Sequence, residues 1–103
     1  MNNRERRRHE RYPCSANVEI DWGSEVLQAS IQDISTSGMF VATPNPLWMR
    51  AQFSARILLP EILPIDCIVR RIEPGHGMAV EFESLSDFAR KSLTDLLGKL
   101  SAE

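Results

Sequence analysis

The sequence predicts a mainly β fold, a small six-stranded antiparallel β-barrel with a C-terminal α-helix and a flexible basic N-terminal arm. Two observations support this prediction. From Cys14 onward, apolar and polar residues alternate in short runs separated by turn residues, which is typical of antiparallel strands. After Ser86 the apolar residues recur at spacings of three and four, which indicates an amphipathic helix. A chain of 103 residues has room for one compact core.

Six runs are predicted as strands because each is alternating or richly apolar and ends at a turn signal. Gly23, the two prolines of residues 43–46, Pro60 and Gly75 mark breaks, since proline lacks the N–H that a central strand needs and glycine favours turns. Short turns join the runs, which is typical of an antiparallel barrel or sandwich. The predicted strands lie at residues 17–22, 27–32, 39–42, 53–59, 65–72 and 78–83.

The C-terminal segment is predicted as a single helix. Ser84 or Ser86 can cap its N-terminus, and the helix dipole favours Asp87 in the first turn. Gly98 weakens the last turn. The last three leucines of its apolar face suit a contact with another molecule as well as they suit the core, so the oligomeric state stays open. That face is made by Phe88, Ala89, Leu93, Leu96, Leu97 and Leu100.

Charge is unevenly distributed along the chain. Residues 1–11, the predicted arm, carry five arginines and a formal charge of +3, whereas residues 12–103, the predicted single domain, carry −5. Between Asn2 and Arg11 the arm has no apolar side chain to bury, so we expect it to be mobile until a ligand orders it. The acidic domain would repel a long nucleic-acid backbone, but a small anion held by the arm avoids this repulsion.

No set of residues in the sequence is typical of a catalytic or metal site. His9 lies in the arm and His76 in a predicted turn, and neither has other ligands at a metal-binding spacing. Cys14 and Cys67 form neither a metal cluster nor a disulfide framework, so we interpret them as reduced thiols. No apolar run approaches the roughly 20 residues of a membrane span, and no signal peptide is recognisable. We expect a cytoplasmic protein that is not an enzyme, needs no cofactor or metal and does not insert into membranes.

A polar segment, DISTSGMF at residues 33–40, interrupts the strand pattern. It is well suited to a turn, since Asp and Ser side chains cap turns and Gly38 can supply a positive φ. Asp33 and Ser35 are two positions apart, so on an extended chain they project to the same side. We expect them to offer a carboxylate and a hydroxyl at one surface, which a turn alone does not require.

Two motifs give the chain a resemblance to the PilZ domain family, bacterial receptors for cyclic di-GMP. The likeness extends from Arg6 to Leu100 and includes GMAVEF at residues 77–82, which is similar to a late strand of these domains. The family's Arg-x-x-x-Arg and Asp-x-Ser-x-x-Gly motifs are matched here by Arg7 and Arg11, and by Asp33, Ser35 and Gly38.

The resemblance implies that cyclic di-GMP is the ligand. An arginine fork can meet O6 and N7 of guanine, and a carboxylate such as Asp33 can accept from N1–H and the N2 amino group. In this family an arginine directly before the Arg-x-x-x-Arg motif accompanies a stacked pair of ligands. Arg6 holds that position, so we expect two copies per chain. The implied binding residues are Arg6, Arg7, Arg11, Asp33, Ser35 and Gly38.

The resemblance further implies a stand-alone receptor that signals to an unidentified protein partner by a change in its own shape. The main alternative is an adaptor of the same fold that contacts other proteins and binds no nucleotide. A third possibility is a small barrel that binds RNA or a single nucleic-acid strand. Against it, Tyr12, Trp22 and Trp48 do not alternate with basic residues as a stacking platform would.

Overall fold

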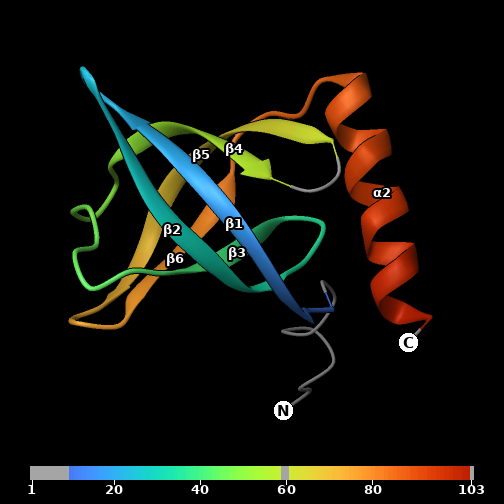
Figure 1. The fold of residues 1–103 in the computed structure, drawn as a ribbon, viewed down its shortest axis with the longest axis horizontal. Coiled ribbons are helices and arrows are strands. Elements are labelled where there is room, and N and C mark those ends of the chain that lie inside the picture. The colour runs from blue at the N-terminus through green and yellow to red at the C-terminus, as the bar shows by residue number, and fades with distance from the viewer. Residues whose placement is uncertain (1–9, 59–60, 103) are drawn as a thin grey trace, which may run out of the picture.

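The computed structural model of the chain describes residues 10–58 and 61–102. Six strands form a closed antiparallel barrel in the order β1-β2-β3-β6-β5-β4, and one helix follows them (Figure 1). The predicted six-stranded antiparallel barrel with a C-terminal helix is therefore confirmed, whereas most of the predicted arm lies outside the described residues. The elements are β1 (Tyr12–Trp22), β2 (Glu25–Ile34), β3 (Gly38–Ala42), β4 (Gln52–Leu58), β5 (Ile62–Glu73), β6 (Gly77–Phe82) and α2 (Asp87–Ser101).

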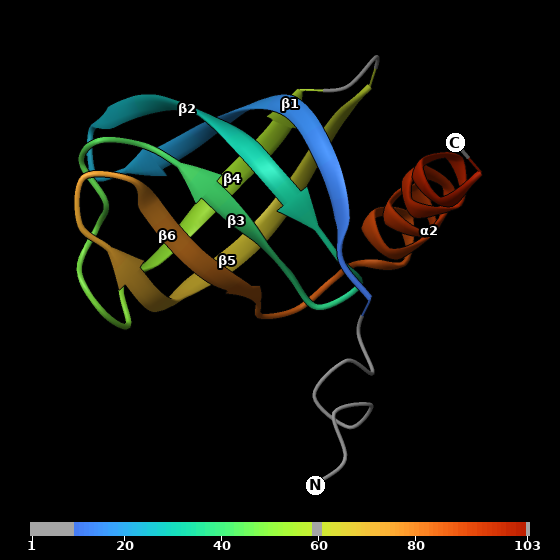
Figure 2. The ribbon, with the colours of Figure 1, turned by 90° about the horizontal axis from the view of Figure 1, so that it is seen from below.

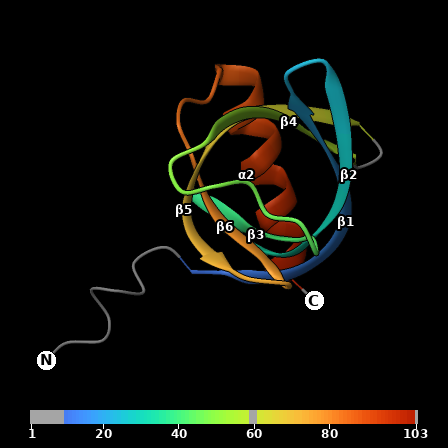
Figure 3. The same cartoon turned by 90° about the vertical axis from the view of Figure 1, so that its left-hand side faces the viewer.

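The barrel interior is filled by every second residue of the strands, as the alternation predicts. In β1, for example, Val18 and Ile20 are buried while Asn17 is exposed. Helix α2 lies against the end of the barrel at which β1 begins (Figure 2). The segment between β3 and β4 lies at the opposite end, which faces the viewer in Figure 3, and its Leu47 and Ala51 are buried in the core. Both ends of the apolar interior are thus covered.

Strand β5 begins earlier than the sequence predicts and includes a proline. Pro64 pairs with Arg56 of β4, but β5 pairs with its other neighbour, β6, only from Cys67 onward. Proline is tolerated here because this part of β5 has a hydrogen-bonded neighbour on one side only. The expected end of β4 at residue 59 lies outside the described residues.

Helix α2 is capped by the second of the two predicted serines. The Ser86 hydroxyl oxygen accepts a hydrogen bond from the Ala89 backbone N–H at 3.0 Å. Ala89, Leu93 and Leu97 are buried and Leu96 and Leu100 pack partly against the core, which leaves part of the predicted face accessible.

The spacing places Phe88 among the apolar residues of α2, but the structure does not bury it with them. Its side chain is 58% exposed. Phe88 precedes Leu93 by five residues, which places it about 140° around an α-helix from the centre of the buried face.

Strands β3 and β6 approach each other unusually closely at two glycines. A Cβ atom on Gly77 would lie 2.2 Å from the Val41 carbonyl oxygen, and one on Gly38 would lie 2.2 Å from that of Val80. Both contacts involve backbone atoms, which cannot move aside as a flexible side chain does. The closed barrel therefore requires glycine at each end of the β3–β6 pair.

Replacing Gly77 with alanine is expected to lower the free energy of unfolding by about 1–3 kcal/mol, because the new methyl group overpacks the β3–β6 contact. Gly98→Ala is the matched control, since its Cβ would have no neighbour within 4 Å. This change in α2 should raise the free energy of unfolding by about 0.5–1 kcal/mol. Urea unfolding measures both, and a Gly77→Ala variant as stable as the wild type would contradict the close approach.

Candidate functional site

The second arginine of the Arg-x-x-x-Arg motif forms an ion pair with the aspartate of the turn motif. Strand β1 places them together, because Pro13 pairs with Asp33 across the β1–β2 ladder. Arg11 Nε donates to Asp33 Oδ1 at 2.8 Å, and Arg11 Nη2 lies 2.6 Å from the same oxygen. The two side chains are 44% and 35% exposed, so a ligand can reach both.

A β-bulge explains why Asp33 faces outward. Ile31 is buried inside the barrel, and simple alternation would place Asp33 inside as well. The register of β2 against β3 shifts between Ile31 and Asp33, so that Asp33 pairs with Phe40. The extra residue reverses the alternation, which exposes Asp33 in part and buries Ile34.

Ser35 lies inside the turn, which differs from the expected surface position beside Asp33. Its side chain is fully buried. The hydroxyl oxygen accepts from the backbone N–H groups of Ser37 and Gly38, each at 3.2 Å, and lies 3.3 Å from the Gly38 carbonyl oxygen. Strand β2 ends at Ile34, so the alternation that predicted a shared surface does not continue to Ser35.

Gly38 is also a structural residue of this turn. The expectation of a positive φ at Gly38 is wrong, because among the described residues the only glycines with positive φ are Gly23 and Gly75. Gly38 is required instead by its close contact with the Val80 carbonyl oxygen. Asp33 thus exposes its carboxylate to solvent, whereas Ser35 and Gly38 stabilise the turn that follows it.

The predicted site residues Arg6 and Arg7 lie outside the described residues. The described part of the chain begins with Glu10, whose carboxylate accepts a hydrogen bond from the Tyr12 hydroxyl at 3.2 Å. Desolvation, followed by this hydrogen bond, raises the pKa of Tyr12. Arg7, which would complete the Arg-x-x-x-Arg motif with Arg11, is therefore known from the sequence only.

A depression of about 400 Å³ adjoins the start of β1 and was not predicted. It separates the motif region from the last turns of α2, and only the folded chain brings these segments together. Glu10, Tyr12 and Thr36 line it from the motif side, and Thr94, Leu97, Gly98 and Ser101 line it from the helix.

Arg70 is a second feature that sequence reasoning missed. It donates from Nε to Glu81 Oε1 at 2.6 Å, and Glu81 pairs with Gly38 across the β6–β3 ladder. A register shift between Val69 and Arg71 interrupts the alternation of β5, and Arg70 is exposed. Arg70 and Arg71 follow each other in an otherwise apolar run. This pattern could have predicted a positively charged side chain on the outside of the barrel near the turn motif.

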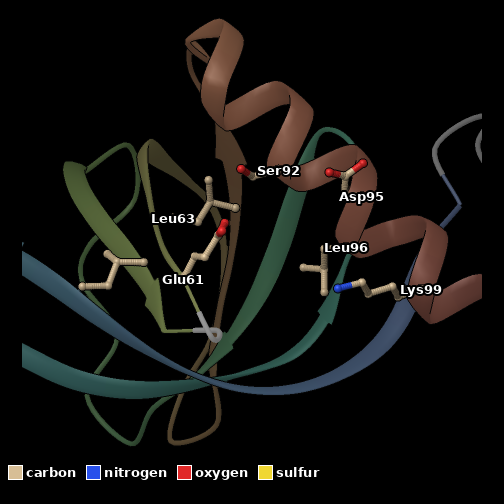
Figure 4. Close-up of a pocket in the computed structure, with 7 residues that line it drawn as sticks. Glu61, Leu63, Ser92, Asp95, Leu96 and Lys99 are labelled. Atoms are coloured by element: carbon tan, nitrogen blue, oxygen red, sulfur yellow. The ribbon is translucent and has the colours of Figure 1, made fainter.

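Another depression, of about 390 Å³, lies between the beginning of β5 and α2 (Figure 4). Leu63 and Glu61 face it from β5 and the segment before it, and Asp95, Leu96 and Lys99 face it from the helix. None of the described motif residues lines this hollow, so it is separate from the candidate site.

The described residues contain no group of three or more His, Cys, Asp or Glu side chains that could hold a metal ion. Within the same part of the chain, no helix combines the length and apolar character needed to cross a membrane.

Comparison with known proteins identifies relatives of the whole domain. The sequence model of the PilZ domain family matches residues 5–99. No curated protein sequence matches the chain.

Solved structures resemble the fold closely. The PilZ domain of YcgR from Escherichia coli, solved with c-di-GMP, has a TM-score of 0.77 at 16% identity, covering 94% of this chain and 92% of that one. The PilZ domain of CeSA from a cellulose-synthesizing bacterium has a TM-score of 0.68 at 22% identity, covering 89% and 98%. The Bacillus subtilis inhibitor of motility, MotI/DgrA, has a TM-score of 0.76 at 21% identity and 88% coverage of this chain, which spans only 48% of that protein. At these identities the likeness concerns the fold alone.

The turn geometry predicts that substitutions at two residues of one motif differ in their effect on stability. Ser35→Ala should lower the free energy of unfolding by about 1–3 kcal/mol without any ligand, because a buried acceptor of two backbone N–H groups is lost. Asp33→Ala should change it by less than about 1 kcal/mol, since its ion pair is well exposed. Urea unfolding of both variants measures the difference, and a larger loss for Asp33→Ala would contradict these roles.

Proposed function

The chain belongs to the PilZ domain family, and on that basis we propose that it is a receptor for cyclic di-GMP. The proposed ligand contacts are Arg6, Arg7, Arg11 and Asp33, with Ser35 and Gly38 shaping the turn that carries Asp33. A solved PilZ domain of similar fold, that of YcgR, contains c-di-GMP, which supports this choice of ligand.

The observation that carries the proposal is the contact between Arg11 and Asp33 at 2.6–2.8 Å. It joins the two sequence motifs on one accessible surface. Guanine has acceptors at O6 and N7 and donors at N1 and N2, so its two edges match a guanidinium and a carboxylate. A guanine that entered the site would replace each partner of the existing ion pair with a group of the same hydrogen-bonding type. Because the pair is exposed, opening it costs little.

The charge distribution supports a small anion in preference to a polymer. Five arginines lie in residues 4–11, whereas residues 12–103 have a formal charge of −5. Two phosphates of one cyclic dinucleotide can lie among the arginines without approaching the acidic barrel. A nucleic-acid backbone of many phosphates would extend over that acidic surface and be repelled.

We propose that the receptor signals through its shape and has no catalytic role, no cofactor and a cytoplasmic location. A ligand held by Arg11 and Asp33 would lie near the depression between Tyr12 and α2 and would change the surface at this end of the barrel. A downstream protein would read that change. The signal would be transmitted because the partner binds one of the two shapes more tightly than the other.

Removing one arginine of the motif should weaken cyclic di-GMP binding without unfolding the domain. Arg7→Ala and Arg11→Ala should each cost roughly 1.5–3 kcal/mol, about tenfold or more in affinity, because a charge-assisted hydrogen bond is lost. Arg90→Ala, an exposed arginine of α2, is the matched control and should bind like the wild type. Isothermal titration calorimetry measures all three.

Asp33 should determine selectivity for guanine. Asp33→Ala removes the acceptor proposed for N1–H and N2, so its affinities for cyclic di-GMP and cyclic di-AMP should differ less than those of the wild type. If the variant discriminates as strongly as the wild type, the assignment of this carboxylate is wrong. Absence of cyclic di-GMP binding by the wild type would favour the adaptor that binds no nucleotide.

Arg6 should control the number of ligands bound. A stacked pair brings four phosphates together, and their repulsion requires additional positive charge nearby. We therefore expect calorimetry to give a stoichiometry near two for the wild type and near one for Arg6→Leu. Binding should also weaken steeply with salt because several ion pairs are screened at once. A wild-type value near one would contradict the stacked pair and leave the single-ligand site in place.

A further inference from the structure

The end of the barrel opposite α2 carries most of the exposed large apolar side chains of the described residues. Trp48 is 60% exposed, and Met49 and Val26 are each 50% exposed. The other two, Ile62 and Phe88, lie elsewhere. A tryptophan that is more than half exposed is unusual on a free surface and common in protein interfaces.

Trp48 is held in place by a second tryptophan. The rings of Trp22 and Trp48 pack edge to face, with centroids 4.7 Å apart and planes inclined by 79°. Trp22 is the last residue of β1 and packs partly against the core. Leu47, which directly precedes Trp48 in the chain, is buried. The exposed ring is therefore an ordered feature of the surface, and its partner would not have to immobilise it on binding.

A depression of about 390 Å³ lies next to this aromatic pair and is rich in carboxylates. Asp21 there is paired with Arg56, which holds the pKa of Asp21 below its usual value mainly through their hydrogen bonds. The lining residues are Asp21, Trp22, Gly23, Gln52, Phe53, Ser54, Asp66 and Glu83.

Two of these carboxylates have no cation within ion-pair distance among the described residues. Asp66 accepts from the Ser54 hydroxyl at 2.9 Å, and Glu83 accepts from the Gln52 amide at 2.8 Å. Burial raises the pKa of the neighbouring Cys67 thiol, and the negative charges of Asp66 and Glu83 raise it further. The depression thus presents uncompensated negative charge beside an exposed tryptophan.

We propose that this surface, formed by Trp22, Trp48, Asp66 and Glu83, is a docking site for a protein segment that carries arginine or lysine beside an apolar side chain. An apolar side chain would pack on Trp48, and the cation would lie in the depression near Asp66 and Glu83. Indole faces also attract cations directly, arginine in particular. Aromatic anchors next to complementary charge are the arrangement found at interface hot spots.

The docking surface is separate from the proposed nucleotide site. Arg11 immediately precedes β1 and Trp22 ends it, so the strand separates the tryptophan pair from Arg11 by roughly 30 Å. Glu83 lies closer to the turn motif, because the backbone N–H of the preceding Phe82 donates to the Ser37 carbonyl oxygen at 2.8 Å. No described residue of the nucleotide motifs lines the acidic depression. The two sites can therefore be tested independently.

The sequence provides a selective reporter, because Trp22 and Trp48 are the only two tryptophans. The probe is an acetylated, amidated octapeptide of alternating arginine and leucine, and the reference peptide has glutamate in place of arginine. Titration into the full chain should change the tryptophan emission saturably for the basic peptide. The acidic peptide should bind at least about tenfold more weakly, because the depression is negative. Equal binding of the two peptides, or no binding of the basic one, would overturn the proposal.

Variants locate the binding surface. The double change Asp66→Asn with Glu83→Gln keeps the acceptors for Ser54 and Gln52 but removes both charges, and it should weaken the basic peptide about fivefold or more. Trp48→Ala should weaken it about tenfold, with Trp22 as the remaining reporter. Phe88→Ala, an equally exposed apolar side chain on α2, should have no effect. Unchanged affinity in the double variant or in Trp48→Ala would contradict the assignment.

Two further measurements distinguish the other outcomes. Sedimentation should show a monomer at the titration concentrations; self-association lost in Trp48→Ala would identify a second copy of the chain as the occupant and overturn the proposal. Calorimetry with cyclic di-GMP should give wild-type affinity for every variant of this surface. Failure of the wild type to bind the nucleotide would count against the proposed function and leave the peptide result unaffected.

Discussion

The β-bulge between Ile31 and Asp33 determines which chemistry the barrel presents beside its N-terminal strand. Without the extra residue, the alternation that buries Ile31 would bury Asp33 too. A carboxylate in that apolar interior would cost several kcal/mol or take up a proton. With the bulge, Asp33 faces solvent, Ile34 completes the core, and Arg11 finds its partner at 2.6 Å. The accessible ion pair depends on this shift of register, and the turn that Ser35 holds comes directly after it.

The sequence predicts the elements well because strand and helix periods depend on nearby residues. The six strands, the helix and its serine cap could be predicted from alternation, spacing and residue type. The roles inside the turn motif could not, because they depend on pairing between strands. Ser35 looked like a surface hydroxyl until the end of β2 at Ile34 was known, and Gly38 looked like a residue of positive φ until the approach of Val80 was visible.

The same limit applies to the two depressions that involve several segments. Tyr12 and Leu97 are far apart in the sequence, as are Trp22 and Glu83, and only the closed barrel brings each pair to one surface. Phe88 shows a limit of the spacing argument for the helix. A spacing of three and four residues indicates an apolar face, but Phe88 lies about 140° from the centre of the side that the barrel covers and stays exposed.

The positions of the two proposed sites also determine how they can influence each other. At physiological salt the Debye length is about 8 Å, so charges separated by roughly 30 Å along β1 scarcely interact through solvent. The phosphates of a nucleotide bound near Arg11 would therefore leave the potential around the Trp22–Trp48 pair almost unchanged. Glu83 lies closer to the turn motif, because the preceding Phe82 donates its backbone N–H to the Ser37 carbonyl oxygen. Coupling from Arg11 to the tryptophan pair would have to pass through the barrel, whose closed hydrogen-bonded wall and filled interior resist gradual deformation. A receptor built in this way would keep the tryptophan pair of the proposed docking surface constant while the proposed ligand altered the surface beside α2.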